Sequence, residues 1–279
     1  MRADLHIHTH YSDGKYSPEV IAEKAVQAGV ELLSMTDHDS LEGLDEKRAA
    51  AKKKGLLFVS GWEVSAYDEL CKVHVLGYNC AREEAYFAFL EERKAGALVR
   101  AEDSLKKANA ALGLSLTMTD VEREHTVKSA PLHTMHVVRA FARALFGDIE
   151  RAGEVYNAYF NAGKPAFSGL CRPTPLEAVR VIHALGGIAV LAHPGRIEKD
   201  FSARERLMRS LVDEGLNGLE CVYSTHSKEE IEYFTAFAKE HGLLVTGGSD
   251  YHAEGRFEIG FPVFEPSEEL LSVLLPSTK

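Results

Sequence analysis

The chain is poor in cysteine and has no long apolar run, and both absences exclude whole classes of protein. Its 4 cysteines form no Cys-x-x-Cys pair, which argues against a disulfide framework and against a zinc site built from thiolates. A run of about 18 apolar residues, as a membrane span needs, is absent. Residues 1–6 also lack the apolar core of a signal peptide. We therefore expect a cytoplasmic protein with no membrane partner.

Basic residues are in short supply as well. The chain has 32 Lys+Arg against 42 Asp+Glu, a formal net charge of −10. This balance disfavours duplex DNA as a partner, because DNA binding uses a broad basic face. A small anionic substrate remains compatible with it, since a local site can be positive on a negative protein.

Strand and helix signals alternate near both ends of the chain. The first helix signal has Ser17 as N-cap and Pro18 at its first position. The expected strands span residues 4–8, 30–36, 56–60, 73–77, 188–192, 218–223 and 243–246. Repeated alternation of this kind predicts an α/β fold, either a parallel sheet or an α/β barrel.

The middle of the chain breaks this rhythm. Residues 82–163 contain helix-like segments and no convincing strand. We interpret the stretch as a helical insertion or lid domain spanning 99–165, inside a discontinuous barrel made of 1–98 and 166–279. Insertions in α/β enzymes often form a lid or a wall that sets specificity.

Histidine is unusually frequent, with 13 copies against 4 cysteines. Many of them fall with carboxylates at or near the carboxyl ends of the expected strands, which share one face of an α/β barrel. The residues in question are His6, His8, Asp13, His38, Glu63, His74, His193, Asp250 and His252. One strand histidine is usually structural, but repeated His/carboxylate groups at successive strand ends favour a common site.

Imidazole and carboxylate together suit Zn, Mn or Fe(II). Nine candidate ligands exceed what one ion can use, so we expect two or three divalent metal ions sharing a bridging carboxylate. Sites of this kind are typical of enzymes that transfer or hydrolyse phosphoryl groups.

These residues occur in motifs that closely resemble the PHP (polymerase and histidinol phosphatase) family. The motifs are Asp4-Leu5-His6-Ile7-His8-Thr9, Ser12-Asp13-Gly14, Thr36-Asp37-His38-Asp39, Glu63, His74-Val75-Leu76-Gly77-Tyr78, Ala192-His193-Pro194 and Ser249-Asp250-Tyr251-His252. The resemblance implies a distorted (β/α)7, TIM-like barrel and metal-dependent phosphoesterase activity. It also implies three ligand sets: His6, His8, Glu63 and Asp250; Glu63, His74 and His193; and Asp13, His38 and His252.

The insertion is similar to a subgroup that includes nucleoside 3′,5′-bisphosphate phosphatases, 5′–3′ exoribonucleases and a cyclic phosphodiesterase acting on phosphorylated ribose. Many members carry Gly-Arg-Pro-His where this chain has His133-Thr134-Met135-His136. The basic residue before the histidine is absent, which leaves a smaller phosphorylated sugar or cyclic phosphate open as substrate. We expect a phosphatase that attacks phosphorus with a metal-bridging hydroxide, and cyclic phosphodiesters are the further substrate class.

Substrate contacts are expected from cations near the same face. Arg196, three residues after His193, is the first choice as a phosphate clamp, and Arg172 and Lys164 are the second. His226 could bind phosphate or protonate the leaving oxygen, and His136 could line the pocket. Surface exposure without function is the competing interpretation for each of the three cations.

Three alternatives stay open at this point. The first is a metal-dependent amidohydrolase on a similar barrel, although no lysine stands at a predicted strand end near the ligands. The second is a non-catalytic PHP module of the kind attached to DNA polymerases. The third is an exoribonuclease acting on short RNA, which should offer a basic or aromatic track for several nucleotides.

Overall fold

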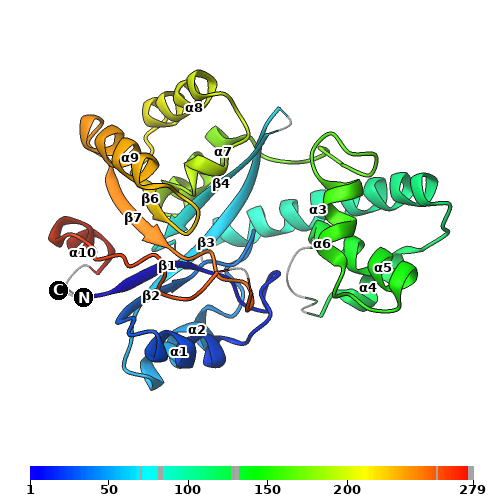
Figure 1. The fold of residues 1–279 in the computed structure, drawn as a ribbon, viewed down its shortest axis with the longest axis horizontal. Coiled ribbons are helices and arrows are strands. Elements are labelled where there is room, and N and C mark those ends of the chain that lie inside the picture. The colour runs from blue at the N-terminus through cyan, green and yellow to red at the C-terminus, as the bar shows by residue number, and fades with distance from the viewer. Residues whose placement is uncertain (70, 81–83, 127, 129–131, 256, 276–279) are drawn as a thin grey trace. The chain divides into compact units, whose positions relative to one another are not determined.

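The structure is a computed structural model that describes residues 1–69, 71–80, 84–126, 128, 132–255 and 257–275. The chain divides into two compact units, one formed by Met1–Tyr86 with Pro173–Lys279 and the other by Phe87–Arg172. Figure 1 shows the strands gathered in the first unit. Among the described helices, none is both long enough and apolar enough to cross a membrane.

Seven strands form one sheet in the first unit, and their order in space is their order in the chain. They are β1 (Ala3–Ile7), β2 (Leu32–Met35), β3 (Leu57–Asp68), β4 (Cys71–Tyr78), β5 (Ile188–Leu191), β6 (Gly218–Tyr223) and β7 (Leu244–Gly248). The two ends of the sheet meet, because His8 N–H donates to Tyr251 O and Asp250 N–H donates to His6 O. The result is a nearly closed barrel, and the predicted fold class is confirmed.

The fourth strand departs from the parallel pattern that the alternation predicted. β4 runs antiparallel to both β3 and β5, whereas the other neighbouring strands pair in parallel. A hairpin joins β3 to β4, so no crossover helix is needed between them. The beginning of β4 therefore lies at the same end of the barrel as the carboxyl ends of the parallel strands.

Helices cover the outside of the barrel. They are α1 (Pro18–Gln27), α2 (Leu44–Lys53), α7 (Pro175–Ala184), α8 (Phe201–Asp213), α9 (Lys228–Glu240) and α10 (Glu268–Leu274). α1 begins after Ser17 with Pro18 in its first turn, as predicted, and buries Ile21, Ala22 and Ala25. The starts of α7 and α9 carry capping boxes at Thr174 and Ser227, which satisfy amide groups that the helix leaves without partners.

Neighbouring residues of one strand belong to two different hydrophobic clusters. Leu32 of β2 packs with Leu5 of β1 and with Leu270 of α10. Leu33 packs instead with Ile21 of α1. Because strand side chains alternate between faces, β2 is buried on both sides, as a strand of a helix-covered barrel must be.

The described residues of the second unit form helices joined by turns and loops, with no strand among them. It holds most of α3 (Glu84–Leu112), together with α4 (Met118–Glu124), α5 (Thr134–Phe146), α6 (Ala152–Val155) and a π-helical turn at Tyr156–Phe160. Phe141 and Phe160 lie in its own apolar core. The predicted insertion 99–165 falls inside this unit; residues 82, 83, 127 and 129–131 of the predicted helical stretch lie outside the described residues.

Candidate metal centre

The barrel gathers all nine predicted ligand residues at one end. His6 is in β1, and His8 and Asp13 follow it. His38, His193 and Asp250 come after β2, β5 and β7. His74 lies at this end for a different reason. It stands in the first half of β4, which runs antiparallel to β3, and it pairs there with Ser65. Among the described strands, β6 alone contributes no predicted ligand.

Three overlapping groups of these side chains have ligand atoms within 4.8 Å of one another. They are His6, His8, Glu63 and Asp250; His8, Asp13, His38 and His252; and His38, Glu63 and His74. The first group is the first set that the resemblance implied, and the second group contains the whole of the third implied set. His193 falls outside these groups, but its Nε2 lies 3.2 Å from Glu63 Oε1 and 3.3 Å from His74 Nδ1.

Glu63 lies at the centre of the arrangement and contacts five of its histidines. Its side chain is fully buried, and its two oxygens divide five imidazole rings between them. Oε1 lies 2.6 Å from a nitrogen of His74, 3.2 Å from His193 and 3.3 Å from His6. Oε2 lies 3.0 Å from His38 and 3.2 Å from His8. A carboxylate in this position is placed to bridge two cations.

The donor set fits divalent metal ions. The buried ring nitrogens His6 Nε2 and His74 Nε2 make no hydrogen bond to any described residue. Buried polar atoms normally have partners, and atoms that converge without one are what a metal site requires. With only imidazole and carboxylate donors, the set suits Zn, Mn or Fe(II).

Electrostatics divide the histidines into two kinds. Burial alone would lower the pKa of His8, but the carboxylates of Asp250 and Glu63 outweigh it and raise that pKa to about 10. Burial lowers the pKa of His74 to about 3 in spite of the nearby Glu63. For Glu63, burial is outweighed by the rings of His74 and His6, which hold the pKa of the carboxyl well below its usual range. His74 is thus ready to ligate a cation, whereas His8 must first lose a proton.

The backbone is strained where two of these residues are presented. His193 has φ +28° and Asp250 has φ +55°, values that residues other than glycine seldom adopt. Strain of this kind concentrates at functional sites. The close approach of β7 to β1 needs Gly248, since a Cβ there would lie 2.4 Å from His6 Cβ.

Comparison with known proteins agrees with this geometry. The PHP domain family model matches residues 4–97. A 3′,5′-nucleoside bisphosphate phosphatase from Chromobacterium violaceum is 32% identical over 256 residues, which cover 90% of this chain and 87% of the relative. The chain belongs to the PHP family.

Other PHP relatives span nearly the whole chain. A phosphoribosyl 1,2-cyclic phosphate 1,2-diphosphodiesterase from Eggerthella lenta is 34% identical and covers 94% of this chain and 99% of its own length. A 5′-3′ exoribonuclease from Haemophilus influenzae is 30% identical, with 92% of each chain covered. A solved structure described as an amidohydrolase from Chromobacterium violaceum, with bound sulfate, matches with a TM-score of 0.82 at 30% identity over 96% of this chain and 93% of its own. This chain is a metal-dependent PHP phosphoesterase, and the predicted activity as a phosphoric ester hydrolase is confirmed.

Sequence reasoning missed the polar residues that hold the PHP ligands in place. Asp37 is fully buried; it accepts hydrogen bonds from Thr9 N–H at 2.8 Å, Thr9 Oγ1 at 2.7 Å and Ser12 Oγ at 2.7 Å. Lys47 of α2, also buried, forms an ion pair with it at 2.6 Å. These hydrogen bonds and this ion pair hold in place the loop that carries Asp13. A charged residue in an otherwise apolar helix face was the available signal for Lys47.

Arg196 lies at the edge of the centre. Its Nη1 donates to Tyr223 Oη at 2.9 Å and to Asp250 Oδ2 at 3.3 Å, and 40% of its side chain is exposed. The structure therefore places the predicted clamp beside a candidate ligand. Its role towards substrate stays a prediction.

Both ring nitrogens of His226 form hydrogen bonds with backbone groups. Its Nδ1 donates to Cys221 O at 2.9 Å, and its Nε2 accepts from Gly195 N–H at 3.1 Å. Burial lowers its pKa, which keeps the ring neutral. These bonds favour a part in holding the Gly195 turn, and phosphate binding or proton transfer by His226 would require one of them to break.

The other predicted substrate residues belong to the second unit. His136 is buried, and its Nδ1 accepts from His133 N–H at 2.9 Å. Arg172 Nε donates to Ser168 O at 2.9 Å, and Lys164 is exposed. Their predicted contacts with substrate remain predictions.

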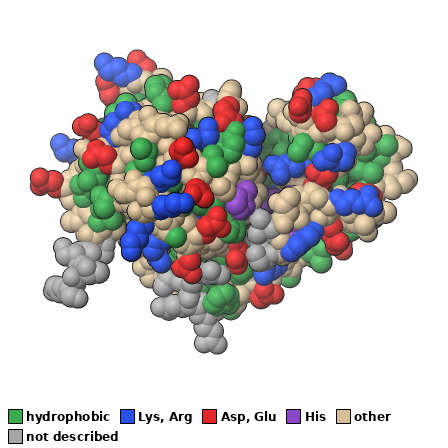
Figure 2. All heavy atoms as spheres, turned by 90° about the horizontal axis from the view of Figure 1, so that it is seen from below, with side chains coloured by type: hydrophobic (Ala, Val, Ile, Leu, Met, Phe, Trp, Pro, Cys, Tyr) green, Lys and Arg blue, Asp and Glu red, His purple; other side chains and the backbone are tan. Residues whose placement is uncertain are grey.

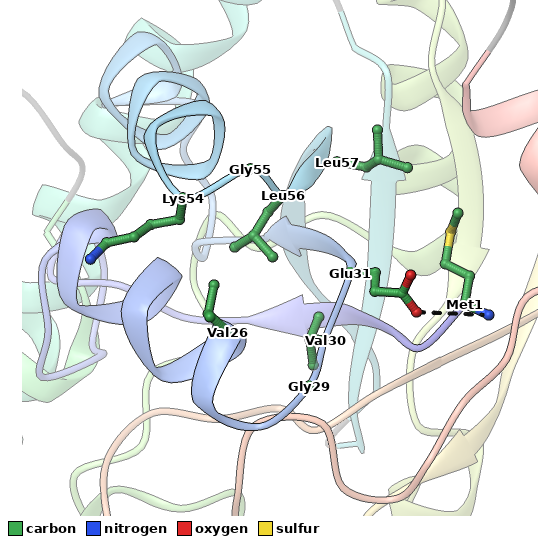
Figure 3. A pocket seen from close by; sticks show the side chains of 9 residues that line it. All are labelled: Met1, Val26, Gly29, Val30, Glu31, Lys54, Gly55, Leu56 and Leu57. Carbon is green, nitrogen blue, oxygen red and sulfur yellow. Dashed lines mark ion pairs between the residues drawn. The ribbon is translucent and has the colours of Figure 1, made fainter.

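A surface pocket lies away from the PHP centre. Met1, Val30, Glu31 and Leu56 are among the residues that line it (Figure 3), and they precede β1, β2 and β3. The pocket is therefore at the opposite end of these strands from the ligands, the end that serves stability in barrels. On the face shown in Figure 2, acidic and basic side chains are interspersed, and histidine reaches the surface over a small area only.

Proposed function

We propose that this chain hydrolyses phosphate esters of a small phosphorylated sugar or nucleotide, acting on phosphomonoesters and also on cyclic phosphodiesters. The observation that carries the proposal is the placement of Arg196 beside the candidate metal centre. The names of the relatives from Chromobacterium violaceum and Eggerthella lenta, a bisphosphate phosphatase and a cyclic phosphate diphosphodiesterase, support these two substrate classes.

The nine clustered residues would hold the metal ions in this proposal. Glu63 would be shared between sites, His6, His8 and Asp250 would complete one site, and the remaining ligands would complete one or two more. Divalent ions there would generate the nucleophile from water and stabilise the charge that develops on the phosphoryl oxygens. Three divalent ions would bring about +6 against −3 from Glu63, Asp250 and Asp13 and −1 from one hydroxide, so a centre with three ions would attract phosphate despite the net charge of −10.

Arg196 orients the substrate phosphate. Only its Nη1 is engaged by described residues, which leaves Nε and Nη2 for a paired contact with two phosphate oxygens. Tyr223 and Asp250 hold the guanidinium in place for this contact. A contact of this type contributes about 1.5–3 kcal/mol.

Short RNA is the second candidate, and it is favoured by the exoribonuclease from Haemophilus influenzae. Two of the three described cations that could form a track, Lys107 and Arg123, are already engaged within the second unit, and Lys106 is exposed. Lys107 pairs with Asp103 at 2.6 Å, and Arg123 pairs with Asp120 at 2.8 Å. These pairs favour the small substrate over a strand of several nucleotides.

The test is a phosphate-release screen with Mn²⁺ over nucleoside 3′,5′-bisphosphates, cyclic phosphates, sugar phosphates and short 5′-phosphorylated RNA. We expect the highest kcat/KM on a small phosphate ester, and Arg196→Gln should lower it by roughly 10- to 100-fold, mainly through KM. Arg180→Gln, at an exposed cation paired with Glu214, is the matched control. Preferred turnover of RNA, or an unchanged KM in Arg196→Gln, would contradict the proposal.

A further inference from the structure

The strand that supplies no predicted ligand has two polar side chains pointed at the ligands of its neighbours. In β6, Glu220 is fully buried and Tyr223 is 1% exposed. Both contact residues of the candidate metal centre, although β6 lies outside all the motifs that identify the family. We propose that β6 is the supporting strand of the centre, with Glu220 and Tyr223 as positioning residues for ligands on β1, after β5 and after β7.

Glu220 holds two of the ligands at once. His6 Nδ1 lies 3.0 Å from Glu220 Oε1 and donates to it, so the opposite nitrogen, Nε2, is the one turned towards Glu63 and Asp250. Glu220 Oε2 accepts from the backbone N–H of His193 at 2.8 Å. A carboxylate behind a ligating imidazole selects the tautomer, orients the ring and makes the ligand more basic.

Tyr223 holds a third ligand. Its hydroxyl donates to Asp250 Oδ2 at 2.8 Å and accepts from Arg196 at 2.9 Å. Asp250 Oδ1 is then the oxygen that faces His8, at 3.2 Å. Oδ2 of Asp250 accepts the hydrogen bond from Tyr223, and Oδ1 faces His8. The Tyr223 hydroxyl therefore determines which oxygen is available to a cation.

A break in the strand pairing lets both residues face the centre. Glu220 and Tyr223 are three positions apart, so a regular strand would point them to opposite faces. The pairing of β6 with β7 shifts register between Glu220 and Val222, which is how a β-bulge redirects a side chain near an active site. The irregularity therefore has a specific consequence, since it brings the hydroxyl to Asp250 while the carboxylate stays on His6.

This inference rests on the proposed metal centre, and the experiment distinguishes failure of the inference from failure of the proposed centre. Binding of Mn²⁺ alone is measured calorimetrically for the wild type, Glu220→Gln and Tyr223→Phe, and Co²⁺ absorption spectra report the ligand geometry. Glu220→Gln keeps the volume, but an amide that accepts from His6 turns its NH₂ group towards the N–H of His193. Glu240→Gln, exposed on α9, and Tyr233→Phe are matched controls that repeat each substitution away from the centre.

We expect Glu220→Gln to lower the affinity for at least one Mn²⁺ by roughly 10- to 100-fold, and Tyr223→Phe to lower it towards the smaller end of that range. Both should alter the Co²⁺ spectrum, while both controls keep the wild-type affinity and spectrum. A lower melting temperature with unchanged Mn²⁺ affinity and Co²⁺ spectrum would show a purely structural role and overturn the inference. Tyr223→Phe removes a single oxygen and decides the question if Glu220→Gln does not fold. Failure of the wild type to bind Mn²⁺ would instead overturn the proposed centre.

Discussion

The buried ion pair between Lys47 and Asp37 leads to a quantitative prediction about stability. Both side chains are at most 1% exposed, and their charged atoms are 2.6 Å apart. Lys47→Met keeps most of the side-chain volume but leaves the Asp37 carboxylate buried without its counter-charge. Breaking one side of a buried pair costs about 3–5 kcal/mol.

The remaining contacts of Asp37 place the expected loss of unfolding free energy at the lower end of this range. Asp37 keeps three hydrogen bonds from Thr9 and Ser12, so a free energy of unfolding about 3 kcal/mol smaller is expected. For a domain of this size, each kcal/mol lowers the melting temperature by about 2–4 °C. Lys47→Met should therefore melt roughly 6–12 °C lower than the wild type.

Urea unfolding followed by tryptophan fluorescence is the assay. The chain has one tryptophan, and Trp62 lies fully buried in β3, so its signal reports the barrel. Lys52→Met, at an exposed position of the same helix, should change stability little. The double variant Asp37→Asn/Lys47→Met removes both charges and should recover part of the loss. A loss below about 1 kcal/mol in Lys47→Met, or no recovery in the double variant, would refute the reasoning.

Three further predictions concern the centre itself. Glu63→Gln should abolish hydrolysis and reduce bound metal, because one oxygen of the proposed bridge becomes an amide; full activity with unchanged metal content would contradict the mechanism. Mn²⁺ affinity should rise with pH below about 10, by up to about tenfold per unit for each proton released, because His8 holds a proton until a cation displaces it; calorimetry in buffers of different ionisation enthalpy measures that proton, and a flat pH profile would exclude it. Gly248→Ala should destabilise the barrel by about 1–3 kcal/mol and weaken Mn²⁺ binding, since its Cβ would meet His6; Gly153→Ala, which meets no atom within 4 Å, is the control.

Local sequence signals were sufficient for most of the barrel. Pro18 after Ser17 marked the start of α1, and the limits expected for residues 218–223 are those of β6. Such signals depend only on residues that are close in the sequence. They predicted these elements correctly because the tertiary contacts stabilise the same helix and strand. The direction of β4 carries no local signal, since a strand has the same side-chain alternation whichever way it pairs. α10, near the end of the chain, was not predicted, and β3 extends eight residues beyond the predicted Ser60.

The sequence by itself determined the chemistry of this protein. Histidines and carboxylates at successive strand ends indicate a multinuclear metal centre, because strand ends in a barrel converge whatever the details of packing. The tertiary structure decided how that chemistry is supported. Glu220 stands 214 positions from His6, and only closure of the barrel brings the two into contact. Distances of that kind are set by the whole fold, so no local pattern could indicate that β6 holds the ligands of its neighbours.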